Sequence, residues 1–337
     1  MQILRTPDER FADLAGYPFR PHYTTVTTPD AAIRAGGSGS GNLAGGDLRV
    51  HYVDEGPTDA PPVLLIHGEP TWSYLYRSMI PPLVAAGFRV IAPDLVGFGR
   101  SDKPAEQTDY TYARHVAWMR QVVFGHLDLR NITYFGQDWG ALVGLRLVAE
   151  QPERFARVVI GNGGMPIGDR RPTDAFLAWH KFARESPGFA IGRIVNGGCV
   201  STLAPEVVAA YDAPFPDERY TAGARVFPSL VPTSTDDPAS ADNAAAWEVL
   251  RRFDKPFLCA FSDSDAITKG GERLFLSQVP GCAGQPHTTV AGAGHFLQED
   301  QGPELARIII EFARSSTSGP ATPGPATPGP ATPGLAT

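Results

Sequence analysis

Short apolar runs and longer amphipathic segments alternate along most of the chain. The segment 63–67 (VLLIH) is a continuous apolar run, which is typical of a strand that is buried on both faces. Runs of similar length recur at 88–94, 131–136, 157–163, 256–262 and 286–294. Segments with helical spacing lie at 113–127, 141–151 and 303–314. This alternation predicts an α/β fold in which helices cover both faces of a mostly parallel sheet.

The alternation breaks after residue 163. Residues 164–247 are rich in helical and loop-forming segments with prolines at the joints, and the strand pattern returns at 256–262. We therefore expect a helical lid over 164–247, inserted between a first part of the core at 1–163 and a second part at 248–315.

Two stretches have compositions that oppose packing. Residues 35–46 (AGGSGSGNLAGG) lie between the alternating segments YTTVTT and LRVHYV, which predicts a long hairpin loop at a sheet edge. The glycines could instead cradle a phosphate, but no strand-to-helix context surrounds them. From residue 319 onward the chain repeats GPATP, and its prolines oppose helix and sheet pairing. We expect a disordered tail over 316–337.

Composition argues against several classes of protein. The 337 residues carry 29 Lys and Arg against 36 Asp and Glu, a net charge of −7, with no basic cluster suited to nucleic acid. Apolar runs stay well short of the roughly 18 residues of a membrane-spanning helix. The charged N-terminal segment lacks the apolar core of a signal peptide. Three scattered cysteines match neither a disulfide framework nor a zinc motif. We expect a cytoplasmic protein with no nucleic-acid or membrane partner and no metal.

The most informative segment is GQDWG at 136–140, between a predicted strand and a predicted helix. It fits the pattern Gly-x-nucleophile-x-Gly of the nucleophile elbow, the strand-to-helix turn of the α/β-hydrolase fold. The central residue is Asp138, and a carboxylate can attack a carbon atom without help from a base. The alternative is that Asp138 only caps the helix, a common use of aspartate.

The segment HGEP at 67–70 follows a predicted strand. In this fold the loop at that place supplies one backbone N–H of an oxyanion hole, and the residue after the nucleophile supplies the other. We therefore assign the backbone N–H groups of Glu69 and Trp139 to this hole. The Glu69 carboxylate could position a hydrolytic water, or it could be solvated or paired with a cation.

The α/β-hydrolase fold places its acid and its histidine after the nucleophile, in that order. His295 follows the last predicted strand and is the candidate general base. Asp263 and Asp265 follow the strand at 256–262, and we prefer Asp265, which lies deeper in the turn. The other place for an acid follows the strand at 157–163, where the sequence has Asn162 and no carboxylate.

Four segments together resemble the haloalkane dehalogenases: HGEPTWSYLYR, GFGRSDKP, GQDWG and AGAGHF. The similarity extends to about residue 315, and it is greatest to the branch with two halide-binding tryptophans. The resemblance implies that Trp139 and Trp179 bind the halide, that Phe176 lines the pocket, and that Asp138 forms a covalent alkyl ester. It further implies a haloalkane and water as substrates, a primary alcohol, a halide and a proton as products, and no cofactor. The simplest expectation for the assembly is a monomer.

Two other functions fit parts of the sequence. Epoxide hydrolases of the same fold also use Asp followed by Trp, and they need two lid tyrosines, for which Tyr211 and Tyr220 are available. The glutamate after His67-Gly68 and the segment FLAW at 176–179 favour dehalogenation. A binding module that has lost its chemistry would have lost a member of the triad, whereas all three members have candidates here.

Overall fold

The computed structural model of the chain describes residues 1–28 and 46–315. Eight strands form one sheet in the order β10-β9-β8-β7-β4-β5-β3-β2. Pairing is antiparallel between β2 and β3 and between β3 and β5, and parallel at every other junction. The strands are β2 (His22–Thr27), β3 (Asp47–Glu55), β4 (Pro62–Ile66), β5 (Arg89–Pro93), β7 (Ile132–Gln137), β8 (Phe155–Gly161), β9 (Phe257–Ser262) and β10 (Thr288–Val290). A separate pair joins β1 (Ile3–Leu4) to β6 (Lys103–Pro104).

The predicted α/β fold with a mostly parallel sheet is confirmed, and each predicted strand lies on an observed one. The largest difference in strand length is at β10, which has three residues, whereas the apolar pattern covers 286–294. The hairpin of β2 and β3 also forms at the edge of the sheet, as predicted. Most of the glycine- and serine-rich segment between them, and the GPATP repeat, lie outside the described residues.

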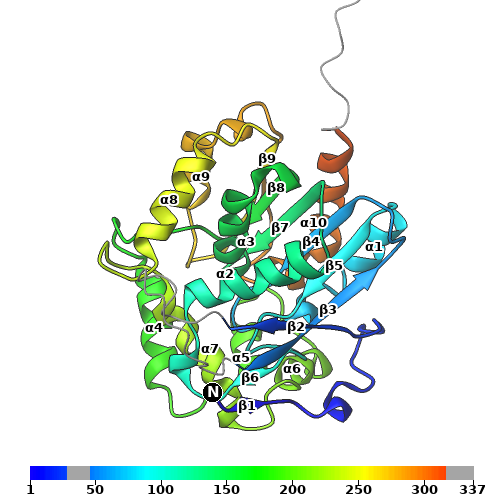
Figure 1. Cartoon of the computed structure of the whole chain (residues 1–337), viewed down its shortest axis with the longest axis vertical. Coiled ribbons are helices and arrows are strands. Elements are labelled where there is room, and N and C mark those ends of the chain that lie inside the picture. Colours follow the sequence, from blue (N-terminus) through cyan, green and yellow to red (C-terminus); the bar gives the residue numbers. More distant parts are fainter. Residues whose placement is uncertain (29–45, 316–337) are drawn as a thin grey trace, which may run out of the picture.

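Helices α2 and α3 lie in front of the strands in Figure 1, and α10 lies behind them. Helix α3 packs against α2 and α8, while α1 packs against α10. The helices of this core are α1 (Ile80–Ala85), α2 (Tyr112–Arg120), α3 (Trp139–Glu150), α8 (Ser240–Leu250), α9 (Glu272–Gln278) and α10 (Leu297–Ser315). A π-helical turn (Gln121–His126) continues α2. Short 3-10 turns cover Asp8–Phe11, Ser73–Tyr76, Gln107–Asp109, Pro152–Arg154, Glu218–Thr221 and Pro280–Cys282.

Four helices between β8 and α8 gather below the central strands in Figure 1. They are α4 (Asp174–Glu185), α5 (Ile191–Gly197), α6 (Pro205–Asp212) and α7 (Ala222–Leu230). Each contacts another member of the group, α4 with α7 and α5 with α6. Residue 247, where we expect the lid to end, lies inside α8, a helix that packs against the core helix α3.

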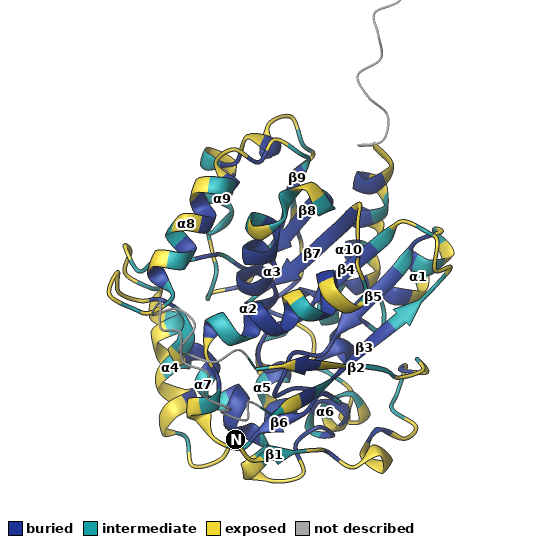
Figure 2. Ribbon diagram, in the orientation of Figure 1, coloured by how far each residue is buried: buried dark blue, intermediate teal, exposed yellow. Residues whose placement is uncertain are grey.

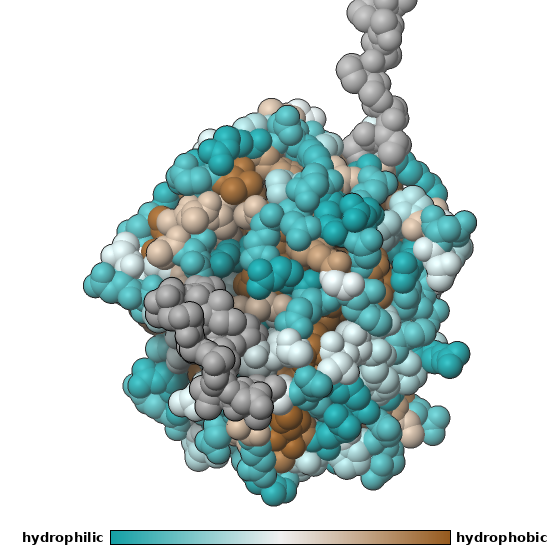
Figure 3. Space-filling view, in the orientation of Figure 1, coloured by the Kyte–Doolittle hydropathy of each residue, from teal (hydrophilic) through white to brown (hydrophobic). Residues whose placement is uncertain are grey.

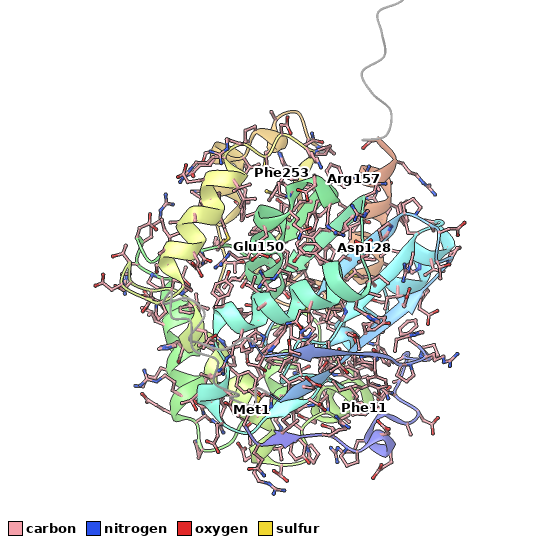
Figure 4. All side chains as sticks on the ribbon, in the orientation of Figure 1. Met1, Phe11, Asp128, Glu150, Arg157 and Phe253 are labelled. Atoms are coloured by element: carbon pink, nitrogen blue, oxygen red, sulfur yellow. The ribbon has the colours of Figure 1, made fainter. Side chains whose placement is uncertain are left out.

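One hydrophobic core joins the sheet to its helices. Phe11 and Phe253, two buried members of this core, are labelled toward opposite ends of the molecule in Figure 4. Figure 2 shows buried residues along the central strands and exposed ones on the outer faces of the helices. Hydrophilic residues dominate the face in Figure 3, with scattered hydrophobic ones between them. Within the described residues, no helix is long and apolar enough to cross a membrane.

Candidate active site

Asp138 occupies the turn between β7 and α3. Its backbone has φ 51° and ψ −126°, an uncommon and strained conformation for a residue with a side chain. The turn needs a glycine two residues later, because a Cβ on Gly140 would lie 1.8 Å from the carbonyl oxygen of Ile66. Within the described chain the Asp138 side chain makes no capping hydrogen bond to α3. The local geometry is therefore that of a nucleophile elbow.

The two carboxylate oxygens of Asp138 face different partners. The backbone N–H of Glu69 donates a hydrogen bond of 2.7 Å to Oδ1. The other oxygen, Oδ2, lies 3.5 Å from Nε2 of His295. Gly68 allows this close approach, since a Cβ there would lie 2.4 Å from Oδ1. One oxygen of the carboxylate is thus fixed by the β4 loop, and the other is directed toward His295.

His295 and Asp265 form a buried pair. Nδ1 of His295 lies 3.1 Å from Oδ2 of Asp265, whose carboxylate also accepts hydrogen bonds from the backbone N–H groups of Ile267 and Thr268. Burial alone would raise the pKa of Asp265, but the His295 charge and these hydrogen bonds lower it to about 2. Burial likewise opposes the imidazolium, and the charges of Asp265 and Asp138 outweigh it, so that the pKa of His295 rises to about 10.

Asp263, the other candidate acid, has a different environment. Its exposed carboxylate accepts hydrogen bonds from the backbone N–H groups of Gly292 and Ala293. It therefore ties the turn after β9 to the loop that leads to His295. This is the local use of aspartate in turns, and it leaves the buried Asp265 as the carboxylate beside the histidine.

Asn162 joins three strand ends, a role that the sequence did not reveal. Its carbonyl oxygen accepts a hydrogen bond of 3.0 Å from the backbone N–H of Asp138. Its side-chain amide donates to Oγ of Ser262 and to the carbonyl oxygen of Gly294, both at 2.8 Å. The only available signal was the place of Asn162 directly after β8, where the sequence has no carboxylate.

Gln137 was also missed by the sequence reasoning, because it stands at a variable position of the elbow motif. Its side chain is fully buried, and its amide nitrogen lies 3.1 Å from Nε2 of His295. The same nitrogen donates to the carbonyl oxygen of His295, also at 3.1 Å. Gln298, itself fully buried, donates to the amide oxygen of Gln137 at 3.4 Å.

A cavity of about 1070 Å³ lies between the helices α4 to α7 and the carboxyl ends of the strands. Asp138 and Trp139 line it from the core, and Phe176 and Trp179 line it from α4. The structure thus brings together the two predicted tryptophans, the predicted pocket phenylalanine and the elbow residue. Among the described residues that line this cavity, neither Tyr211 nor Tyr220 occurs. The hydroxyl of Tyr211 instead donates to the Glu299 carboxylate.

Glu69 lies in the wall of the same cavity and is only 3% exposed. Burial, strengthened by the charge of Asp138, raises the pKa of its carboxyl group well above the ordinary value, although the charge of His295 and a hydrogen bond from Trp179 act in the opposite direction. Its Oε1 has no hydrogen-bond partner among the described residues. The side chain is therefore shielded from bulk solvent, and no salt bridge joins it to a cation in the described part of the chain.

Metal-binding residue types are also present in and around the site. Within residues 1–28 and 46–315, however, no three His, Cys, Asp or Glu side chains form a group that could hold a metal ion.

Comparison with known proteins agrees with the fold and the site. A family model described as alpha/beta hydrolase fold matches residues 61–301, so the chain is an α/β hydrolase. A haloalkane dehalogenase of Psychrobacter cryohalolentis is 56% identical over 312 residues, which cover 93% of this chain and 98% of the relative. One of Mycobacterium marinum is 52% identical over 93% of this chain and its own full length. The chain therefore belongs to the haloalkane dehalogenases, hydrolases that act on carbon–halogen bonds.

Solved structures agree with this assignment. The haloalkane dehalogenase DpaA from Paraglaciecola agarilytica NO2, described as tetrameric, superimposes with a TM-score of 0.80 at 34% identity. The match covers 91% of this chain and 97% of that one. The activity predicted from the sequence, hydrolytic dehalogenation, is thus confirmed. The epoxide hydrolase alternative is not favoured, and the two tyrosines on which it relied lie outside the cavity wall.

Proposed function

We propose that Asp138 is the nucleophile of this hydrolytic dehalogenase. Oδ2 of Asp138 attacks the carbon that carries the halogen, the carbon–halogen bond breaks, and the halide leaves with the bonding electron pair. The products of this first step are a halide ion and an alkyl ester of Asp138. Since the carboxylate is already charged, the step needs no base.

We propose that His295 acts in the second step, hydrolysis of the ester. A water molecule gives a proton to Nε2 of His295 as its oxygen attacks the carbonyl carbon of the ester. Asp265 holds the ring in place through Nδ1 and stabilises the imidazolium that forms, as the distance of 3.1 Å between them supports. The backbone N–H groups of Glu69 and Trp139 hold the oxyanion. The tetrahedral intermediate then collapses: the bond between the carbonyl carbon and Oδ2 breaks, the departing oxygen takes the proton of the added hydroxyl group, and the alcohol leaves. His295 then returns its own proton to solvent.

The halide is assigned to the indole N–H groups of Trp139 and Trp179. Indole is a donor without an acceptor, so two of them stabilise the charge that grows on the leaving halogen, once the Trp179 N–H turns from the Glu69 carboxyl group to the halide. Both line the cavity beside Asp138, with Phe176 as an apolar neighbour. The buried Glu69 carboxyl group, with its Oε1 lacking a partner among the described residues, offers a contact for the hydrolytic water.

One observation carries this proposal: the asymmetric environment of the Asp138 carboxylate. Oδ1 is held by the Glu69 backbone at 2.7 Å, which leaves Oδ2 free to attack beside His295. The test is release of halide from 1,2-dibromoethane or 1-chlorobutane by the wild type, by Asp138→Ala and by Asp236→Ala, which replaces an exposed aspartate. Asp138→Ala should abolish turnover with the fold intact, and Asp236→Ala should retain it. Halide release by Asp138→Ala at a rate near that of the wild type would overturn the assignment.

We further propose that the chain works as a monomer in the cytoplasm, without a cofactor. Every group in the proposed reaction comes from one chain, and the free cysteines Cys199, Cys259 and Cys282 suit a reducing compartment. Light scattering coupled to size-exclusion chromatography would test the assembly state, and a tetramer like the DpaA relative would overturn the monomer. Cell fractionation would test the location.

A further inference from the structure

The contact between Gln137 and His295 involves the ring nitrogen that accepts the proton in the proposed reaction. Gln137 is the last residue of β7, directly before the nucleophile, and its side chain is fully buried. The amide nitrogen lies 3.1 Å from Nε2 of His295, the atom that must take a proton from water. This contact is shorter than the 3.5 Å between the same Nε2 and Oδ2 of Asp138.

Neighbouring hydrogen bonds define the orientation of the Gln137 amide. The atom that faces the carbonyl oxygen of His295 at 3.1 Å must be the NH₂ group, because a carbonyl oxygen can only accept. The amide oxygen then faces the NH₂ group of Gln298 at 3.4 Å. The group that faces Nε2 of His295 is therefore a donor.

A donor at that place favours one state of the imidazole ring. Nε2 can accept a hydrogen bond only when it carries no proton, which is the neutral ring with its hydrogen on Nδ1. That hydrogen is directed at Oδ2 of Asp265, 3.1 Å away. Gln137 and Asp265 thus select the same tautomer from opposite sides of the ring, and it is the tautomer that a general base at Nε2 requires.

Two carboxylates act on the charge of the ring in the opposite direction. Asp265 contacts Nδ1 and Asp138 faces Nε2, and both stabilise the imidazolium. Glu69 also interacts with the charge of His295. Burial raises the pKa of the Glu69 carboxyl group, however, and so disfavours the charged form that would stabilise the imidazolium. When Asp138 becomes an ester it loses its negative charge, whereas the donor of Gln137 remains. The equilibrium between the imidazolium and the neutral ring of His295 then shifts toward the neutral ring.

We propose that Gln137 is a positioning residue that holds His295 neutral, with Nε2 free of a proton, while the alkyl ester waits for water. The inference rests on the proposed function, in which His295 is the base for ester hydrolysis. The two hydrogens of the amide allow this role. One keeps its hydrogen bond to the His295 carbonyl oxygen, while the hydrogen bond of the other to Nε2 breaks when Nε2 takes its proton.

The test compares Gln137→Met with Gln298→Met. Gln137→Met keeps a side chain of similar length and removes the donor, and Gln298→Met changes the next buried amide without touching His295. Hydrolysis of the alkyl ester is followed by intact mass in single-turnover experiments between pH 5 and 10. In Gln137→Met the acid limb of this profile should move upward by roughly half to one pH unit. Below the limb hydrolysis should be roughly three- to tenfold slower, and above it the rate should equal or exceed that of the wild type.

The outcomes separate this inference from the proposed function. Absence of a halide burst and of an adduct on Asp138 in His295→Gln would overturn the proposed function itself. A normal burst and adduct with an unmoved acid limb in Gln137→Met would overturn the role of Gln137 alone. An equal shift in Gln298→Met would also overturn it, because the effect would then come from packing rather than from the donor.

A measurement that keeps Gln137 in place covers the case in which Gln137→Met does not fold. Asp138→Ala removes the charge at Nε2 and adds no new donor, so that it imitates the electrostatics of the ester. Nitrogen NMR of the His295 ring in this variant should show the neutral ring at pH 7 with its hydrogen on Nδ1. An imidazolium, or a neutral ring protonated on Nε2, would overturn the inference.

Discussion

Replacement of His295 by glutamine separates the two steps of the proposed reaction. The attack of Asp138 needs no base, so His295→Gln should still release about one halide per active site. Ester hydrolysis should then slow by roughly 10²- to 10⁴-fold, the usual contribution of a general base. The nearest candidate for a substitute base is Glu69, and burial raises the pKa of its carboxyl group well above the ordinary value. Burial disfavours the charged carboxylate, which is the form that could take the proton, so we expect most of the loss to remain.

The assay is rapid-quench measurement of halide together with intact mass of the protein. The stalled protein should gain the mass of the alkyl group, and peptide mapping should locate it on Asp138. His287→Gln is the matched control, since His287 lies before β10 and contacts the backbone of Cys259 and Cys282. That variant should turn over normally. Normal turnover by His295→Gln, or no burst and no adduct on a substrate that the wild type accepts, would refute the reasoning.

Three further predictions concern the surroundings of the nucleophile. Trp179→Phe keeps a ring but loses the N–H donor, so carbon–halogen cleavage should slow roughly 10- to 1000-fold in single-turnover kinetics; an unchanged rate would reduce Trp179 to packing. In Gly68→Ala the new methyl group would lie 2.4 Å from Oδ1 of Asp138. The halide burst should therefore slow about a hundredfold. The melting temperature should fall by roughly several degrees, because the same methyl group would lie 2.5 Å from Cβ of Asp138 in the buried elbow. Finally, the Asp265 carboxylate stabilises the folded protein above pH 4, because its pKa is lowered from 3.8 to about 2. Roughly 2 kcal/mol should be lost as pH falls from 4 to 2, and Asp265→Asn should lack this part of the acid dependence in chemical denaturation.

The features that the sequence predicted well depend on short stretches of chain. The elbow at Asp138 follows from the spacing of two glycines around an acidic residue, and the strand before it follows from a local apolar run. The order of Asp138, Asp265 and His295 is likewise a property of the chain that the fold requires. Such signals can be recognised in the sequence without knowing which segments lie side by side in the fold.

The contacts that the sequence could not provide join residues far apart in the chain. Asn162 reaches Ser262, 100 positions away, and Gln137 reaches His295, 158 positions away. Both depend on the order of strands in the sheet and on the loops that follow them, which periodicity does not determine. The burial of Glu69 belongs to the same group, because the helices that line the cavity with it have no sequence pattern that fixes how they pack.

In the proposed reaction, the hydrogen bond from the Glu69 backbone to Oδ1 of Asp138 determines where the oxygen of the product alcohol comes from. In the proposed reaction Oδ2 enters the ester and departs with the alcohol, and an atom from water takes its place. The first alcohol that each protein molecule forms in heavy-oxygen water is therefore unlabelled, and every later one carries the label. Oδ1 remains behind throughout, so Asp138 keeps one of its original oxygens and renews the other with each turnover.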